Sequence, residues 1–201
     1  MFSIAITGGI GSGKTTVSLY LARTYKLAYI NSDTLVRHFQ KKNSATCRKI
    51  IKSFGRTICY KDGRLKRRKL AGLIFGDPSA RRRLNRIVHP EVIRSIKEGL
   101  KRPRFKQMPA VIVEVPLLFE THLEKLFDLT VVVSVPRSIQ IARVQKKFHV
   151  SRIEALQRIK AQVGPAEKIK KADLVIRNFT NKKTLERKAD KLWEKIRTRL
   201  G

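Results

Sequence analysis

The fold of this chain is decided by Gly8-Gly9-Ile10-Gly11-Ser12-Gly13-Lys14-Thr15, which matches the pattern G-x-x-x-x-G-K-[ST] at every fixed position. The stretch follows an apolar run, Phe2–Ile6, and opens a helical pattern, which is the strand–loop–helix context that the motif requires. Glycines let successive backbone N–H groups converge on phosphate oxygens, and the helix that follows adds its positive dipole end. Residues 8–15, the phosphate loop, are therefore predicted to bind a nucleoside triphosphate.

Each side chain of the loop has an expected role. Lys14 is expected to reach the β- and γ-phosphates of ATP, and the Thr15 hydroxyl is expected to be a ligand of Mg²⁺. The alternative is a glycine-rich strand-to-helix turn with a chance lysine. The residues predicted to bind ATP in this part of the chain are Gly9, Gly11, Ser12, Gly13, Lys14, Thr15 and Thr16.

Short apolar runs alternate with longer amphipathic stretches, which is typical of an α/β protein with a parallel sheet. The runs are rich in Val and Ile without polar alternation, so both faces of the sheet should be covered by helices. We predict a P-loop NTPase fold with a five-stranded parallel sheet. The predicted strands are Phe2–Ile6, Ala28–Ile30, Ala110–Val115, Thr130–Val135 and Leu174–Ile176.

The segments between these strands predict three parts. A nucleotide-binding core is expected over residues 1–34, 109–140 and 171–201, a helical substrate-binding insertion over 35–108, and a lid over 141–170. Within the insertion, Asp77-Pro78 is typical of a helix start, and His89-Pro90 is expected to break that helix and begin another. Ser151 and Glu154 form a capping-box pattern, and the last helix is expected over about 182–200, with Leu200 on its apolar stripe.

Two acidic residues follow or occupy predicted strands. Asp33 comes just after the second strand, at the sheet edge where the phosphate loop should lie, so it is a candidate general base or a water-mediated Mg²⁺ ligand. It is also a candidate N-cap of a helix beginning at Thr34-Leu35, and the two roles are compatible. Glu114 lies inside an apolar strand, where a carboxylate is costly unless it is paired. It either orders a Mg²⁺-bound water or pairs with a lysine of the insertion.

Several motifs together resemble the dephospho-coenzyme A kinase family. The resemblance runs from about Phe2 to Asn178, in that family's order and spacing, and Asn31 stands where the family often has aspartate. The motifs are the phosphate loop, the strand ending before Asp33, Asp62-Gly63-x-Leu65, Asp77-Pro78…His89-Pro90, Pro116-Leu117-Leu118-Phe119-Glu120, Gln140-x-x-Arg143 and Ala172-Asp173-x-Val175-Ile176-x-Asn178.

This resemblance implies transfer of the ATP γ-phosphate to the ribose 3′-hydroxyl of dephospho-CoA, giving CoA and ADP, with Asp33 as the general base. It also implies that Lys14 and Arg143 assist catalysis, with Arg143 and Arg158 on the lid. Asn178 is placed near the adenine. The residues implied to bind the acceptor are Asp33, Arg67, His89, Pro116 and Leu117. The plainer alternatives are a solvated helix face for Arg143, a helix corner for His89, and one cation in a basic run for Arg67.

The composition restricts the other functions that this chain could have. The formal net charge of +31 favours polyanionic partners, so a nucleic-acid-binding ATPase is a rival, but basic residues are spread along the chain and aromatics make up 7%. A shikimate- or gluconate-type kinase is the nearer rival. The two cysteines, Cys47 and Cys59, lack metal-site spacing, and no segment suggests a signal peptide or a membrane span, so we expect a soluble cytoplasmic enzyme. Incidental polyanion binding is compatible with this view, and the oligomeric state stays open.

Overall fold

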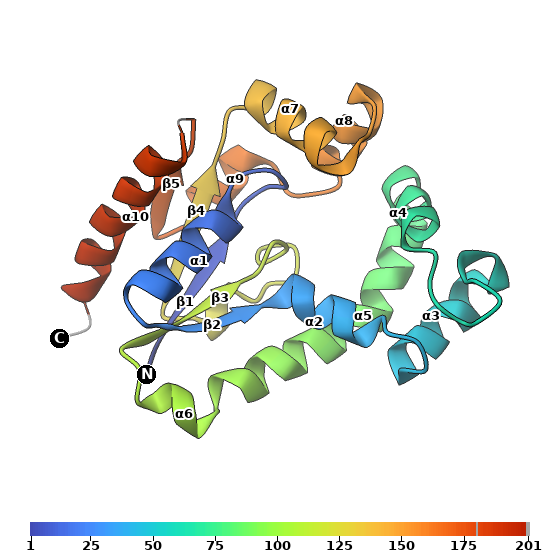
Figure 1. The fold of residues 1–201 in the computed structure, drawn as a ribbon, viewed down its shortest axis with the longest axis horizontal. Coiled ribbons are helices and arrows are strands. Elements are labelled where there is room, and N and C mark those ends of the chain that lie inside the picture. The colour runs from blue at the N-terminus through green and yellow to red at the C-terminus, as the bar shows by residue number, and fades with distance from the viewer. Residues whose placement is uncertain (180, 200–201) are drawn as a thin grey trace. The chain divides into compact units, whose positions relative to one another are not determined.

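A computed structural model describes residues 1–179 and 181–199 of the chain (Figure 1). The chain divides into two compact units, a larger one of Met1–Asn31 with Gly99–Gly201 and a smaller one of Ser32–Glu98. Leu200, predicted on the last apolar stripe, lies outside the described residues. No helix within the described ranges combines the length and the apolar character needed to cross a bilayer.

The larger unit is built on a five-stranded, all-parallel sheet with the strand order β2-β3-β1-β4-β5, which confirms the predicted P-loop NTPase fold. Ile6 of the first strand and Asn31 of the second both lie in register with Glu114, so three strands end at one edge. Residues on both faces of the central strands are buried, as the Val and Ile runs predicted. The strands are β1 (Phe2–Thr7), β2 (Ala28–Asn31), β3 (Ala110–Glu114), β4 (Leu129–Ser134) and β5 (Leu174–Arg177).

Two helices, α1 (Lys14–Thr24) and α10 (Lys182–Arg197), pack together against the sheet. Their apolar stripes and alternate strand residues form one buried core, in which Leu21 of α1 and Trp193 of α10 take part. Tyr20 and Tyr25 donate hydrogen bonds from their hydroxyls to Asp190, joining the two helices at the rim of that core. Burial and the hydrogen bond to Asp190 raise the pKa of Tyr25 to about 12.

Helices α7 (Arg137–Phe148) and α8 (Arg152–Lys160) form an arm, defined here as residues 137–164, beyond the carboxyl end of β4 (Figure 1). The two helices close around a small apolar cluster of Ile141, Val144, Ala155 and Ile159. The predicted capping box is confirmed, because the Ser151 hydroxyl accepts from the Glu154 N–H and the Glu154 carboxylate accepts from the Ser151 N–H. The elements that complete the unit are α6 (Pro103–Lys106), the 3₁₀ turn η2 (Glu124–Leu126) and α9 (Pro165–Lys170), which packs on β4.

The smaller unit is helical. Its elements are α2 (Ser32–Phe39), α3 (Ala45–Phe54), the 3₁₀ turn η1 (Arg56–Ile58), α4 (Arg67–Gly76) and most of α5 (Pro78–Leu100). A short antiparallel bridge joins Cys59 to Leu65, and Gly63 turns the chain between them with a φ of 84°. The N-cap predicted at Asp77 is confirmed, because its carboxylate accepts from the Ser79 N–H at 2.7 Å.

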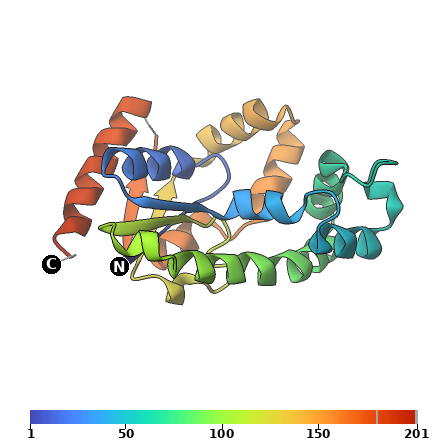
Figure 2. The ribbon, with the colours of Figure 1, turned by 60° about the horizontal axis from the view of Figure 1, so that its bottom comes forward.

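The prediction that His89-Pro90 begins a new helix is wrong, because Pro90 lies inside α5. The ribbon of this helix runs on without a break (Figure 2). Proline in a helix interior removes one backbone hydrogen bond and costs about 3 kcal/mol. The apolar residues Leu84, Val88, Val92 and Ile96 nevertheless keep an unbroken spacing of four across it, and all four are buried. Burial of an aliphatic side chain contributes about 1.5–3 kcal/mol, so four of them outweigh the local cost.

Asp33 is not the N-cap of α2. The helix begins at Ser32, two residues earlier than predicted, and this places Asp33 inside the first turn with its side chain exposed. A carboxylate in the first turn is stabilised by the helix dipole without making a cap hydrogen bond. The carboxylate is therefore available for another role.

Candidate active site

The phosphate loop connects β1 to α1, and its last glycine is required by its backbone and its surroundings. Gly13 precedes α1 in the left-handed conformation, with φ 92° and ψ 12°. A Cβ atom on Gly13 would lie 2.3 Å from the Asn178 amide nitrogen. That amide donates a 2.7 Å hydrogen bond to the Ser12 carbonyl, and Asn178 is only 3% exposed. Asn178 therefore braces the loop from inside the protein.

Glu114 is buried at the end of β3, where three neutral side chains hold its carboxylate. The Thr15 hydroxyl donates to Oε1 at 2.6 Å, the Tyr29 hydroxyl to Oε2 at 2.7 Å, and the Asn31 amide to Oε2 at 3.1 Å. These bonds offset the desolvation of the carboxylate and place it directly beside the loop hydroxyl. An aspartate at position 31 would have no N–H to donate to Glu114, so the asparagine suits this neighbour.

The oxygens of Thr15 and Glu114 have the chemistry of a magnesium site. Mg²⁺ prefers hard oxygen ligands and is usually held by one or two protein oxygens together with substrate phosphates and water. The part of the chain that the structure describes contains no group of three or more His, Cys, Asp or Glu side chains that would hold a metal by themselves. The hydroxyl–carboxylate pair beside the phosphate loop therefore fits Mg²⁺ bound together with a nucleotide.

A cleft of about 490 Å³ opens at the loop. Its walls carry the cations of Lys14, Arg143, Lys146, Lys147 and Lys182, so the cleft is suited to a polyanion. The remaining lining residues are Gly11, Gly13, Thr15, Thr16, Asn178, Asn181 and Leu185.

Most predicted nucleotide-side residues are thus brought together in the larger unit. Lys14 is the first residue of α1 and is 9% exposed, while Ser12 is buried. Arg143 is half-buried on α7, with Nη1 3.5 Å from the Gly11 carbonyl. Arg158 packs its guanidinium 5.0 Å from the centre of the Phe148 ring. Arg143, and not Arg158, is the arm arginine that lines the cleft.

The loop after β3 contains two predicted acceptor-binding residues. Pro116 is buried, and its carbonyl accepts from the Lys168 ammonium at 3.0 Å and from the Thr7 hydroxyl at 3.4 Å. Leu117 is half-buried. The Pro116 carbonyl thus links the loop after β3 to β1 and to α9. Of the two residues, Leu117 has the more accessible side chain.

The other predicted acceptor-side residues belong to the smaller unit. Asp33 lies in the first turn of α2, Arg67 is the first residue of α4, and His89 lies in the middle of α5. Asp33 and Arg67 are exposed and His89 is half-buried. Their side chains are carried by three different helices of that unit.

Several residues of the larger unit have roles that the sequence reasoning missed. Gln140 and Gln162 bond the backbone of Ile10, Lys168 pairs with Glu120 in the interior, and Tyr29 holds Glu114. For Gln140, the motif Gln140-x-x-Arg143 is the sequence feature that marks the position as functional. Nothing local distinguishes Lys168 in a chain with 46 lysines and arginines.

Known proteins resemble this chain over nearly its whole length. A family model described as dephospho-CoA kinase (CoaE) matches residues 2–184. The dephospho-CoA kinase of Fusobacterium nucleatum is 37% identical over 193 residues, which cover 96% of this chain and 97% of that protein. The corresponding protein of Carboxydothermus hydrogenoformans is 38% identical over 175 residues, or 87% of this chain and 84% of that protein.

Solved structures share the fold of this chain. TT1252 from Thermus thermophilus superposes with a TM-score of 0.76 at 34% identity, covering 96% of this chain and 97% of that one. Shikimate kinase from Acinetobacter baumannii has a TM-score of 0.57 at 15% identity, covering 99% of this chain and 94% of that one, and shows a shared fold alone. The resemblance inferred from the motifs is therefore confirmed: this chain belongs to the dephospho-CoA kinase family.

Proposed function

We propose that this protein transfers the γ-phosphate of ATP to the ribose 3′-hydroxyl of dephospho-CoA, yielding CoA and ADP in the final step of CoA synthesis. The observation that carries the proposal is the family match over residues 2–184, joined to a basic cleft at the phosphate loop. Both substrates are polyanions, which suits a chain with a net charge of +31.

On the nucleotide side, the chain positions and neutralises the triphosphate. Backbone N–H groups of the phosphate loop and the Lys14 ammonium bind the β- and γ-phosphate oxygens, and Arg143 offsets charge that develops during transfer. Gly9, Gly11, Ser12, Gly13 and Thr16 shape the loop, and Asn178 supports it from behind. Thr15 and Glu114 would hold Mg²⁺, which supplies further neutralisation of the phosphate oxygens.

On the acceptor side, Asp33 takes the proton of the 3′-hydroxyl as that oxygen bonds to the γ-phosphorus and the bond to the β-phosphate oxygen breaks. Asp33 follows Asn31 by two residues along the chain, and Asn31 lies in register with Glu114 at the edge where β1 enters the phosphate loop. Its exposed carboxylate is consistent with a role as base. Arg67, His89, Pro116 and Leu117 bind the CoA moiety.

The three-part organisation accompanies this mechanism. Residues 35–108 form the substrate-binding insertion and residues 141–170 form a lid that excludes water from the phosphates, on a core of residues 1–34, 109–140 and 171–201. The cytoplasm is the proposed compartment, since the thiols of Cys47 and Cys59 are unlinked in the structure. No specific nucleic acid or membrane partner is required.

A coupled assay of ADP formation tests the proposal with dephospho-CoA, shikimate and gluconate offered separately as acceptors. Magnesium-dependent turnover with dephospho-CoA, and identification of CoA as the product by mass spectrometry, is the expected result. Turnover of shikimate or gluconate in place of dephospho-CoA would show that the acceptor is wrong. ATPase activity stimulated by RNA without dephospho-CoA turnover would overturn the kinase assignment itself.

A further inference from the structure

Two glutamine side chains of the arm form hydrogen bonds with the backbone of one residue of the phosphate loop, Ile10. The Gln140 amide nitrogen, from the first turn of α7, donates to the Ile10 carbonyl at 2.9 Å. The Gln162 amide oxygen, from the segment after α8, accepts from the Ile10 N–H at 2.8 Å. Both backbone polar groups at the tip of the loop are therefore bonded to opposite ends of the arm.

The chemistry of the backbone dictates the direction of each bond. A carbonyl accepts hydrogen bonds and does not donate them, so the group facing the Ile10 oxygen must be a donor. The Ile10 N–H needs an acceptor for the same reason. Gln140 supplies an N–H and Gln162 supplies an oxygen, which makes the two positions chemically opposite although the residue is the same.

The Gln162 end of the arm is held from behind by buried polar groups. The neighbouring Val163 N–H donates to the Glu120 carboxylate at 2.8 Å, and the Lys168 ammonium reaches the same oxygen at 2.9 Å. Lys168 is 1% exposed and also donates to the Pro116 carbonyl. Position 162 is thus fixed to the loop after β3 and to α9.

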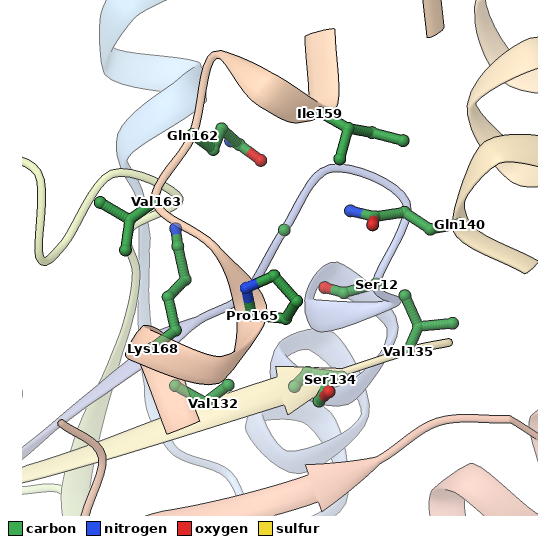
Figure 3. A pocket seen from close by; sticks show the side chains of 12 residues that line it. Ser12, Val132, Ser134, Val135, Gln140, Ile159, Gln162, Val163, Pro165 and Lys168 are labelled. Carbon is green, nitrogen blue, oxygen red and sulfur yellow. The ribbon is translucent and has the colours of Figure 1, made fainter. Parts of the chain in front are cut away.

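The arm lies close against the phosphate loop. A cavity of only about 20 Å³, enough for roughly one water molecule, separates them (Figure 3). A Cβ atom on Gly9 would lie 2.5 Å from the Gln140 amide nitrogen, so the absence of a side chain there lets Gln140 reach Ile10. The Ser12 hydroxyl borders the same cavity.

We propose that Gln140 and Gln162 are positioning residues that hold the phosphate loop in its nucleotide-binding form and couple that form to the placement of the arm. The proposal rests on the assignment of the loop to ATP and extends it to regulation of the same site. Because coupling between two equilibria is reciprocal, nucleotide binding stabilises the arm as much as the placed arm stabilises nucleotide binding.

Replacing each glutamine in turn by glutamic acid distinguishes the contributions of the two hydrogen bonds. Gln162→Glu keeps an acceptor for the Ile10 N–H, whereas Gln140→Glu replaces the donor with a second acceptor against the Ile10 carbonyl. Each variant adds one negative charge at the same loop residue, so each is the control for the other. We expect Gln140→Glu to weaken ADP binding about 10- to 100-fold relative to Gln162→Glu, as measured by calorimetry.

Hydrogen exchange over residues 137–164 supplies a second readout. In the wild type and in Gln162→Glu, ADP should slow exchange in the arm, and in Gln140→Glu that protection should be lost. Gln140→Lys restores a donor and should recover ADP affinity. Equal thermal unfolding midpoints for the variants without ADP would show that the change lies in the coupling and not in folding.

Equal ADP affinity of the two glutamate variants would overturn the proposal, and so would unchanged arm protection in Gln140→Glu. If Gln140→Glu fails to fold, Gln140→Met, which removes the donor to the Ile10 carbonyl without adding a charge, takes its place under the same criteria. ADP binding is measured without any acceptor. A wild-type protein that binds ADP but does not phosphorylate dephospho-CoA would therefore contradict the proposed function and leave this test intact.

Discussion

The nucleotide side of the larger unit and the helical smaller unit hold their polar groups in different ways. Around the phosphate loop, Glu114, Asn178 and Lys168 are each 3% exposed or less, and each is bonded to specific neighbours. In the smaller unit, the ion pair between Arg64 and Asp62 has side chains 69% and 42% exposed. Exposed pairs contribute little to stability, whereas buried ones are costly to break.

This difference suggests a division of work between the two units. The nucleotide side is preorganised, because buried hydrogen bonds fix the loop before a ligand arrives. The smaller unit is stabilised by helix packing, and its candidate functional groups, Asp33 and Arg67, lie exposed on helix surfaces. Substitutions in the two regions should therefore have separable effects on binding, turnover and stability.

The largest effect is expected from Asp33→Asn. The variant should lower the turnover number by about two to four orders of magnitude, the usual range for a lost general base. Its affinity for ADP should stay close to wild type, because the phosphate loop belongs to the larger unit. Steady-state kinetics and calorimetry provide the two measurements.

Glu98→Gln is the matched control for Asp33→Asn, since it removes one negative charge from an exposed position of the same unit. It should leave turnover within about twofold of wild type, as expected for a surface substitution. Near-normal turnover in Asp33→Asn would show that this residue of the smaller unit is not the general base. It would thereby contradict the proposed division between a nucleotide-binding unit and an acceptor-side unit.

Lys168→Met should have the next largest effect, on stability. It leaves the Glu120 carboxylate and the Pro116 carbonyl without their buried donor, and we expect the free energy of unfolding to fall by about 3 kcal/mol. At this chain length the midpoint of thermal unfolding should drop by about 6–12 °C. The control is Lys171→Met, which removes an exposed lysine paired with Glu167 and should leave the midpoint unchanged. A similar drop in both variants would contradict the contrast between buried and exposed pairs.

Lys14→Met should weaken ATP binding by about 10- to 100-fold, the loss expected for a hydrogen bond to a charged group. The ammonium of Lys14 lines the cleft at the phosphate loop, and no other loop side chain carries a positive charge in residues 8–15. Calorimetry with a non-hydrolysable ATP analogue measures the loss. Lys160→Met, an exposed lysine of α8, should bind the analogue normally, and equal losses in both variants would indicate general charge attraction alone.

Pro90→Ala should have the smallest effect and the opposite sign. Alanine restores the backbone N–H that proline lacks in the interior of α5, and the larger entropy of its unfolded chain offsets part of the gain. The free energy of unfolding should rise by about 1–2 kcal/mol, as measured by chemical denaturation. Pro78→Ala, at the first position of the same helix where proline is favourable, should give no gain. A loss of stability in Pro90→Ala would mean that contacts of the proline ring support the smaller unit.

Much of the fold was predictable from local patterns. The phosphate loop, the five strands and the capping box at Ser151 depend on residues close together in the sequence, and all three are confirmed. The predicted burial is wrong for β5, where Val175 is exposed because the strand lies at the edge of the sheet. The prediction of a helix break at His89-Pro90 was wrong, because the apolar stripe that spans most of α5 outweighs the local effect of the proline. The strength of that stripe depends on burial, which the local signal does not contain.

The candidate site was predictable only where a motif carries its chemistry. Lys14, Thr15 and Arg143 line one cleft, as the motif and the resemblance indicated. The hydrogen bonds that hold these groups in place were not predictable, because they come from residue types without a distinctive motif. Tyr29 bonds Glu114, and two glutamines bond the backbone of Ile10. Glutamine and tyrosine occur throughout proteins, and only their neighbours in space give them these roles.

The sequence by itself determined the strand–loop–helix form of the phosphate loop at Gly8–Thr15, and its motifs determined the family. Those features are local, since glycine spacing and apolar runs act on the backbone within a few residues. The tertiary structure alone decided which lysine is buried and which glutamines meet the loop. Gln140 and Gln162 are 130 and 152 residues away from Ile10 along the chain, and the sheet order that places β1 beside β4 brings them together.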